Sequence, residues 1–334
     1  MKSPRYPFTG FPSGWYAVAR SDELPAGTVH GVRYFDEDIA LYRATDGTAH
    51  ATGAHCPHLG AYLPAGGRVV DDRIRCPFHG FEFDGRGRCT KTACGTKVPP
   101  KARLRSWHVR EIAGFVLLWY DATGRAPAWE IEVPDMTGWT SPRIDTVEMR
   151  THPQETSENS VDLGHFSELH GFRRPTILEP CQTDGPLLTI SYAARLDRIP
   201  RVVDRVRRMF GAPEAGLSLH FKVRVHGLGW SLAEGEIAAL GMRFRQFVLA
   251  TPIDQDRIHL RIGTAVERRL PGVDWVLREF GFRSVAKEVE RDRPIWENKR
   301  YLEHPVLAKG DGPIGAYRRW ARQFYPQRSP ACRC

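Results

Sequence analysis

The sequence has no long apolar run and no apolar leader. Its most apolar stretch, residues 114–120 (GFVLLWY), has the length of a β-strand. A membrane-spanning helix needs roughly 18 consecutive apolar residues. Residues 1–15 also lack the apolar core of a secretory signal peptide. These patterns exclude a membrane-spanning helix, and we expect a soluble, cytoplasmic protein.

Cysteine is scarce and odd in number, with seven among 334 residues. Cys89, Cys94 and Cys181 are scattered, and Cys332 and Cys334 stand near the C-terminus. This pattern is not a disulfide framework, so we expect a reduced compartment. The last two cysteines either bind a metal or belong to a disordered end.

Two nucleotide-binding signatures are also missing. No Gly-x-Gly-x-x-Gly fingerprint follows a predicted strand, so the chain does not bind NAD(P)H itself. The net charge is +9, but acidic residues lie among the basic ones and no nucleic-acid recognition motif occurs. A basic run such as 201–208 (RVVDRVRR) indicates either a solvated surface or a docking face for an acidic electron-transfer protein.

Two short cysteine–histidine pairs are the most informative motifs present. Cys56 and His58 form the first pair, and Cys76 and His79 form the second after seventeen intervening residues. This is the ligand order of a Rieske [2Fe–2S] cluster, in which two thiolates hold one iron and two imidazoles hold the other. A structural zinc site is the alternative, although zinc sites usually pair cysteine with cysteine and histidine with histidine. We predict a Rieske cluster on these four residues.

The length and the strand pattern predict two domains in an α+β protein. Residues 14–125 carry short alternating apolar runs separated by turn signals, which predict an all-β domain. A segment rich in Pro and Gly, 121–134, reads as a linker. We place an N-terminal Rieske domain at 1–128, a catalytic domain at 129–326 and a disordered tail at 327–334.

The second half is predicted to be mixed. Residues 217–225 alternate apolar with polar side chains and predict a half-buried strand, with further strands at 244–250 and 258–266. Residues 275–302 predict a helix with a break at Pro294.

A second constellation follows the linker. His165 and His170 are accompanied by nearby acids, which suggests the two-histidine, one-carboxylate site of non-haem Fe(II) oxygenases. Five residues on a regular helix separate two side chains by about 140°. The two histidines can therefore converge only if the helix is broken or carries a π-type bulge. Two unrelated surface histidines are the alternative. A Rieske cluster only transfers electrons, however, and a two-domain chain is expected to use them in its second domain. This favours a metal site on the two histidines.

The carboxylate ligand must come from elsewhere in the chain. Asp292 is the best candidate and Glu290 the second, although both stand in a charged run with Glu288 and Arg291 that could be plain surface. Asp162, three residues before His165, could share a helix face with it and hold its distal N–H. It could equally be an ordinary surface acid.

With both motifs in view, the chain resembles the Rieske non-haem iron oxygenases over essentially its whole length. The match rests on the cluster motif and on Asn159-x-x-Asp162-x-x-His165-x₄-His170. The resemblance implies a helix-grip catalytic domain that binds mononuclear Fe(II) and uses O₂. It implies a homotrimer in which the cluster of one subunit feeds the iron of the next, with Asp162 as the bridge between subunits.

The C-terminal part resembles one branch of that family. Segments 292–302 (DRPIWENKRYL), 311–320 (DGPIGAYRRW) and 323–325 (QFY) look like those of 3-ketosteroid 9α-hydroxylase oxygenases and Neverland-type cholesterol 7-desaturases. This implies hydroxylation or desaturation of a steroid-like or polycyclic substrate. Electrons would come from a reductase, directly or through a ferredoxin, so NAD(P)H would act only indirectly. The alternatives are a non-steroid substrate, such as an aromatic compound or secondary metabolite, and a Rieske electron carrier or metal-binding module without oxygenase activity.

Overall fold

The computed structural model describes residues 5–93, 95–196, 217–237 and 241–326. The predicted tail at 327–334, with Cys332 and Cys334, lies outside these residues. The chain divides into two compact units. The N-terminal unit comprises 13–134 with 251–255, and the C-terminal unit comprises 1–12, 135–250 and 256–334. Within the described residues, no helix is both long enough and apolar enough to span a membrane.

These units differ from the predicted domains at the chain's start. Residues 1–12 belong to the C-terminal unit because the ring of Phe8 packs among three aromatic side chains there. Its centroid lies 4.8 Å from that of His152, 4.9 Å from that of Tyr301 and 4.6 Å from that of Tyr325. The segment is too short to carry a periodic pattern that would predict this packing.

The described residues of the N-terminal unit form three small antiparallel sheets and one 3₁₀ turn, η1 (Ser21–Glu23). The first sheet has the order β1 (Gly14–Arg20), β11 (Phe115–Tyr120) and β10 (Val109–Ile112). The second has the order β2 (Val29–Tyr34), β3 (Glu37–Arg43), β4 (Ala49–Gly53) and β9 (Ser106–Trp107). The third has the order β5 (Arg68–Val70), β6 (Arg73–Arg75), β7 (Glu82–Phe83) and β8 (Cys89–Lys91). The predicted all-β character of this half is confirmed.

The C-terminal unit is built on one seven-stranded sheet. Its order is β12 (Arg143–Met149), β18 (Ile258–Val266), β17 (Met242–Pro252), β16 (Trp230–Ile237), β15 (Leu217–His226), β14 (Leu187–Leu196) and β13 (Phe172–Asp184). The described helices of this unit are α1 (Pro153–Glu158), α2 (Gly164–Glu168), α4 (Pro271–Asn298) and α5 (Ile314–Ala321), followed by the 3₁₀ turn η3 (Arg322–Phe324). The sheet and helices confirm the predicted α+β class.

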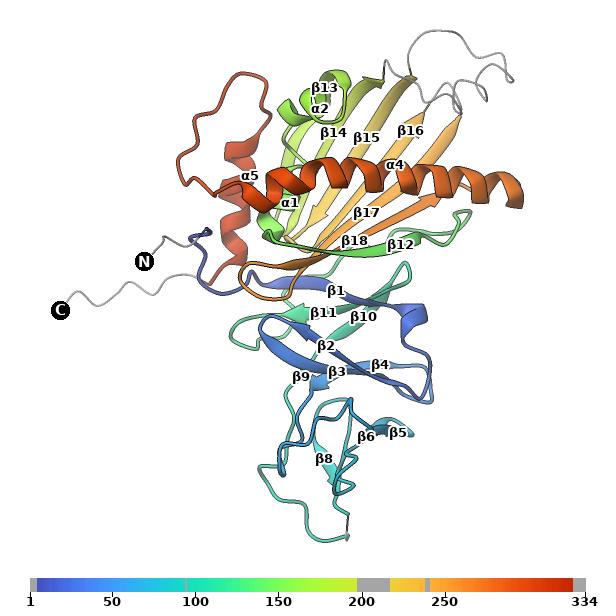
Figure 1. The fold of residues 1–334 in the computed structure, drawn as a ribbon, viewed down its shortest axis with the longest axis vertical. Helices are drawn as coiled ribbons and strands as arrows, with labels where there is room; N and C mark the ends of the chain where they lie inside the picture. The colour runs from blue at the N-terminus through green and yellow to red at the C-terminus, as the bar shows by residue number, and fades with distance from the viewer. Residues whose placement is uncertain (1–4, 94, 197–216, 238–240, 327–334) are drawn as a thin grey trace, which may run out of the picture. The chain divides into compact units, whose positions relative to one another are not determined.

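The long helix α4 lies across one face of the seven-stranded sheet (Figure 1). Phe282, Val289 and Trp296 recur every seven residues along α4 and are buried. They pack in one core cluster with side chains of β18 such as Leu260 and with Met149 of β12. A seven-residue apolar repeat keeps one helix face on its partner, so this stripe fixes the rotation of α4 about its own axis.

Both ends of the predicted helix require correction. The helix begins at Pro271, where the fixed φ of proline suits the first turn. A carboxylate oxygen of Asp274 accepts hydrogen bonds from the backbone N–H groups of Arg269 (2.9 Å) and Leu270 (3.2 Å), which supports this start.

The predicted break at Pro294 is wrong, because the helix continues to Asn298. The Asn298 amide donates to the carbonyl of Pro294 (2.8 Å), and sheet packing holds both sides of the proline in line.

A buried ionic clamp holds α1, which leads directly into the histidine segment. The Arg318 guanidinium of α5 donates to both carboxylate oxygens of Glu158 at 2.6 and 2.9 Å. Lys299, just after α4, lies 2.5 Å from the fully buried carboxylate of Glu155. Burial raises the pKa of Glu155, an effect that the charge of Lys299 opposes. Three helices are thus joined by two charge pairs.

Arg318→Ala should destabilise the protein by about 3 kcal/mol, because it leaves Glu158 buried without its bidentate partner. Urea unfolding followed by tryptophan fluorescence measures the change. Arg319→Ala is the matched control, since Arg319 is exposed on the same helix and should change stability little. Equal stability of the two variants would contradict a structural role for the clamp.

Candidate metal centres

Two similar loops of the N-terminal unit carry the predicted cluster ligands. The N–H of Gly60 donates to the carbonyl of Cys56 (2.9 Å), and the N–H of Gly80 donates to that of Cys76 (3.1 Å). Both glycines have positive φ, +76° and +64°, which only glycine adopts without strain. Each loop therefore closes tightly just after its histidine.

The four predicted ligands are arranged as two thiols inside and two imidazoles toward the surface. Cys56 and Cys76 are each only 2% exposed. The rings of His58 and His79 lie with centroids 4.7 Å apart and planes at 77°. Burial raises the pKa of the Cys56 thiol. A coordinated metal ion overrides such a shift because it deprotonates the thiol outright. This donor set fits a [2Fe–2S] cluster.

The two histidines of the second constellation come from a short helix and the turn that follows it. His165 lies on α2, which ends at Glu168, and His170 lies in the turn after it. Gly171 has φ +70°, which turns the chain into β13. The helix is thus broken between the histidines, without a π-type bulge. The break brings their ring centroids to 5.0 Å.

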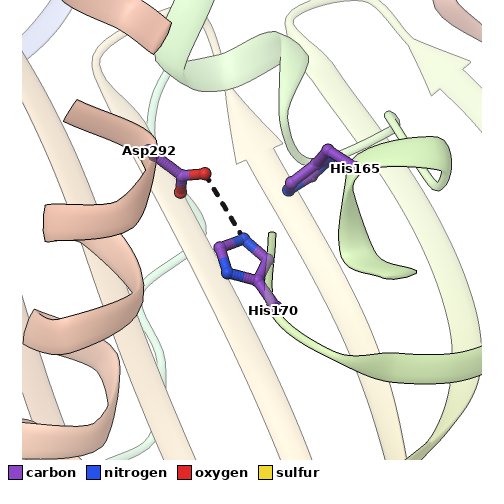
Figure 2. Close-up of side chains that lie close together, drawn as sticks. All are labelled: His165, His170 and Asp292. Atoms are coloured by element: carbon purple, nitrogen blue, oxygen red, sulfur yellow. Dashed lines mark ion pairs between the residues drawn. The ribbon is translucent and has the colours of Figure 1, made fainter. Parts of the chain in front are cut away.

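Asp292 of α4 completes a three-residue group with these histidines (Figure 2). One ligand atom from each residue lies within 4.8 Å of the other two. Asp292 Oδ1 lies 3.4 Å from His170 Nε2. That oxygen is buried and has no hydrogen-bond partner among the described residues. Glu290 is exposed and pairs instead with Arg293 at 2.9 Å.

The electrostatics of this triad fit a cation. Burial raises the pKa of Asp292, and the neighbouring His170 and His165 oppose the rise. A buried carboxylate oxygen without a donor is costly unless a cation or a donor satisfies it. Two imidazoles and one carboxylate are the ligand set of non-haem Fe(II) sites, which keep further coordination positions open. The triad can therefore hold one such metal ion.

Asp162 lies just before α2 instead of sharing a helix face with His165. One of its oxygens accepts the backbone N–H groups of Gly164 (3.0 Å) and His165 (3.3 Å). The other lies 3.6 Å from Nδ1 of His165, which is longer than a hydrogen bond. Burial alone would raise the pKa of Asp162, but attraction by His165 and the backbone donors lowers it.

Glu288 is also a neighbour of the triad, although its place in a charged run of the sequence predicted only a solvated surface residue. Its carboxylate lies 2.7 Å from Nδ1 of His170. Burial would raise the pKa of Glu288, but hydrogen bonds from His170 and Arg291 lower it. The sequence feature that could have identified Glu288 is its position four residues before Asp292, because this spacing places both acids on one face of a helix.

Comparison with known families gives two matches that together cover most of the chain. Residues 14–107 match the Rieske [2Fe-2S] domain. Residues 118–325, more than half of the chain, match the family described as the 3-ketosteroid 9alpha-hydroxylase C-terminal domain. The first range contains the Cys–His pairs and the second contains the triad.

Relatives of known function match nearly the full length. Cholesterol 7-desaturase nvd of Xenopus laevis is 30% identical, over 96% of this chain and 73% of the relative. The oxygenase component of 3-ketosteroid-9-alpha-monooxygenase of Rhodococcus rhodochrous is 27% identical, over 94% of this chain and 80% of the relative. The branch inferred from the C-terminal segments is confirmed by these matches.

Solved structures share the fold at lower identity. Dicamba monooxygenase bound to dicamba superposes with a TM-score of 0.71 at 22% identity, covering 95% of this chain and 98% of the other. An NdmA QL mutant of Pseudomonas putida CBB5 with caffeine gives 0.72 at 19% identity, covering 92% and 89%. The family matches, the relatives that align with nearly the whole of this chain and the shared fold show that the chain belongs to the Rieske non-haem iron oxygenases.

Proposed function

We propose that this enzyme hydroxylates or desaturates a hydrophobic steroid, sterol or comparable polycyclic compound. It is an oxidoreductase whose cofactors are a Rieske [2Fe–2S] cluster and mononuclear iron, with O₂ as co-substrate. When bound, the cluster supplies single electrons and the iron activates O₂. The convergence of His165, His170 and Asp292 on one point carries this proposal, because an electron carrier has no need of a second metal site.

The protein's own groups have distinct tasks in this proposal. Cys56, His58, Cys76 and His79 hold the cluster. His165, His170 and Asp292 would hold the iron, and a set of two imidazoles and one carboxylate would leave coordination positions available for O₂ and substrate. Asp162 links the two centres between neighbouring subunits of a homotrimer.

A row of aromatic side chains near the triad favours an apolar substrate. Tyr192, Phe221, Gly235 and Phe244 pair directly across β14, β15, β16 and β17, so they share one face of the sheet. A Cβ on Gly235 would lie 2.1 Å from the Phe244 ring, so the glycine makes room for it. Phe166 connects the row to the metal ligands, with its ring 5.2 Å from that of Tyr192 and 4.5 Å from that of His165.

The steroid class rests on this row together with the named relatives. Phe221 and Phe244 are only half-buried, and an apolar ligand gains free energy by covering such surface. The family of the C-terminal domain and both relatives reported above act on steroids or sterols by name. A smaller aromatic substrate is the second candidate, since structures of the same fold carry dicamba and caffeine.

The electron source is a separate protein in this proposal. One relative is named as an oxygenase component, which supports a flavin reductase or a ferredoxin as partner. We place the enzyme in the cytoplasm, where the thiols of Cys89 and Cys181 would stay reduced.

Replacing His165, His170 or Asp292 by Ala should abolish product formation and mononuclear iron binding while the Rieske absorption spectrum persists, because each variant removes one of three ligands. Iron and acid-labile sulfide analysis with visible spectroscopy measures both centres. Glu290→Ala is the control and should keep both.

The reciprocal variant, Cys76→Ser, should lose the cluster. Stoichiometric zinc without acid-labile sulfide in the wild-type protein would overturn the cluster assignment. Full activity in all three triad variants would overturn the iron assignment.

Asp162→Asn should retain both metal centres yet slow electron delivery by about tenfold or more, because the proposed link between the centres loses its charge. The measurement is stopped-flow re-oxidation of the pre-reduced cluster after addition of substrate and O₂. Light scattering should show a trimer. Re-oxidation at the wild-type rate, or a fully active monomer, would remove the proposed link between subunits.

A steroid should stimulate O₂ uptake coupled to a product that has gained one oxygen or lost two hydrogens. The assay supplies a surrogate reductase and a panel of sterols, 3-ketosteroids, small aromatic acids and methylxanthines, with products identified by mass spectrometry. Stimulation only by the small aromatic compounds would retain the oxygenase and reject the steroid class.

A further inference from the structure

Each ring nitrogen of His170 faces a carboxylate, but only Nδ1 is hydrogen-bonded. Its side chain is only 5% exposed, with Nδ1 2.7 Å from a carboxylate oxygen of Glu288 and Nε2 3.4 Å from Asp292 Oδ1. An ionised carboxylate can only accept a hydrogen bond, so Nδ1 must carry the proton. In the neutral ring, Nε2 then keeps its lone pair on the side that faces the triad.

Glu288 is itself fixed in place. Arg291 donates to both of its carboxylate oxygens, at 3.0 and 2.7 Å, from less than one turn further along α4. Val289, the next residue, anchors this turn in the core. Glu288 and Asp292 stand four residues apart on the same helix. One rigid turn therefore supplies both a metal-binding carboxylate and the partner of a metal-binding histidine.

The other histidine lacks such a partner within the described part of the chain. His165 Nδ1 is buried without a hydrogen bond, and the nearest carboxylate, that of Asp162, is 3.6 Å away. The two acids therefore differ: Glu288 makes a short bond to its histidine, whereas Asp162 is engaged mainly by backbone N–H groups.

We propose that Glu288 is a positioning residue that fixes the tautomer and ring orientation of His170, so that Nε2 binds the metal, and thereby sets the metal affinity of the triad. The inference rests on the proposed function, because it takes His165, His170 and Asp292 as the metal ligands. Carboxylate partners of metal-bound histidines typically change metal affinity by about 10- to 100-fold.

The test is Co(II) binding by the full-length protein after chelation of the mononuclear metal, with the Rieske cluster retained and oxidised. Equilibrium dialysis gives the Kd for Co(II). The EPR spectrum of high-spin Co(II) reports its ligand geometry, because the oxidised cluster is EPR-silent. Neither readout depends on turnover.

Glu288→Ala should weaken Co(II) binding by about 10- to 100-fold and alter the Co(II) EPR spectrum. Glu288→Gln should recover much of the affinity, because the amide oxygen can still accept the Nδ1 proton. Glu290→Ala is the matched control, since Glu290 forms the same kind of ion pair three residues before an arginine but does not contact the triad. Glu290→Ala should have the Co(II) affinity and the EPR spectrum of the wild type.

Three results would overturn the inference. Glu288→Ala could bind Co(II) within twofold of wild type with an unchanged spectrum. Glu288→Ala could lose Co(II) as completely as His170→Ala, which would make Glu288 a ligand. Glu288→Gln could also show no recovery over Glu288→Ala. If His170→Ala itself kept wild-type Co(II) affinity, the metal assignment in the proposed function would fail instead.

Discussion

The packing of α4 on the seven-stranded sheet is the constraint on which the candidate metal site depends. Asp292 reaches His165 and His170 only because a buried stripe fixes the rotation of this helix. A turn of the helix by one residue would move the carboxylate about 100° around the axis. Metal sites tolerate little displacement of their ligands, and side chains on packed helices are placed more accurately than side chains on loops.

Two groups of buried acids show how structural and metal-binding clusters differ. Glu155 and Glu158 are balanced by Lys299 and Arg318, so their charges are satisfied by the protein itself. Around the triad, the partners of Asp292 are imidazoles, and one buried oxygen is left without a donor in the described structure. Without a cation, such a carboxylate is costly to keep ionised. Asp292, which pairs with no lysine or arginine among the described residues, is therefore the acid that fits a metal.

The backbone architecture and the choice of substrate depend on different parts of the structure. The same architecture occurs in structures with dicamba and caffeine, so the sheet and helices do not select a ligand. Selection must come from the side chains on the face of the sheet near the triad. There, the paired row that contains Tyr192 and Phe221 presents rings instead of charges. The relatives that share the C-terminal domain point to the same apolar class.

Most features of the fold and of the candidate sites that could be predicted from the sequence came from local motifs. The cluster motif was readable because its ligands stand in two short segments, each closed by its own turn. Strand 217–225 was predicted to within one residue of its observed end because alternation is a local signal. The spacing of His165 and His170 required an interrupted helix, but it left open whether by a break or a bulge. That choice depended on Gly171 and on the path into β13.

The rest was decided by tertiary structure. Sequence offered Asp292 and Glu290 as alternatives, and only the rotation of α4 on the sheet separated the buried acid from the exposed one. Pro294 predicted a break that core packing overrode. Glu288 was hidden in a charged run because a carboxylate is recognised as a histidine's partner only when the distant histidine is seen beside it. The sequence thus determined the chemistry of the two centres, and the fold determined which side chains surround them, because those contacts join residues far apart in the chain.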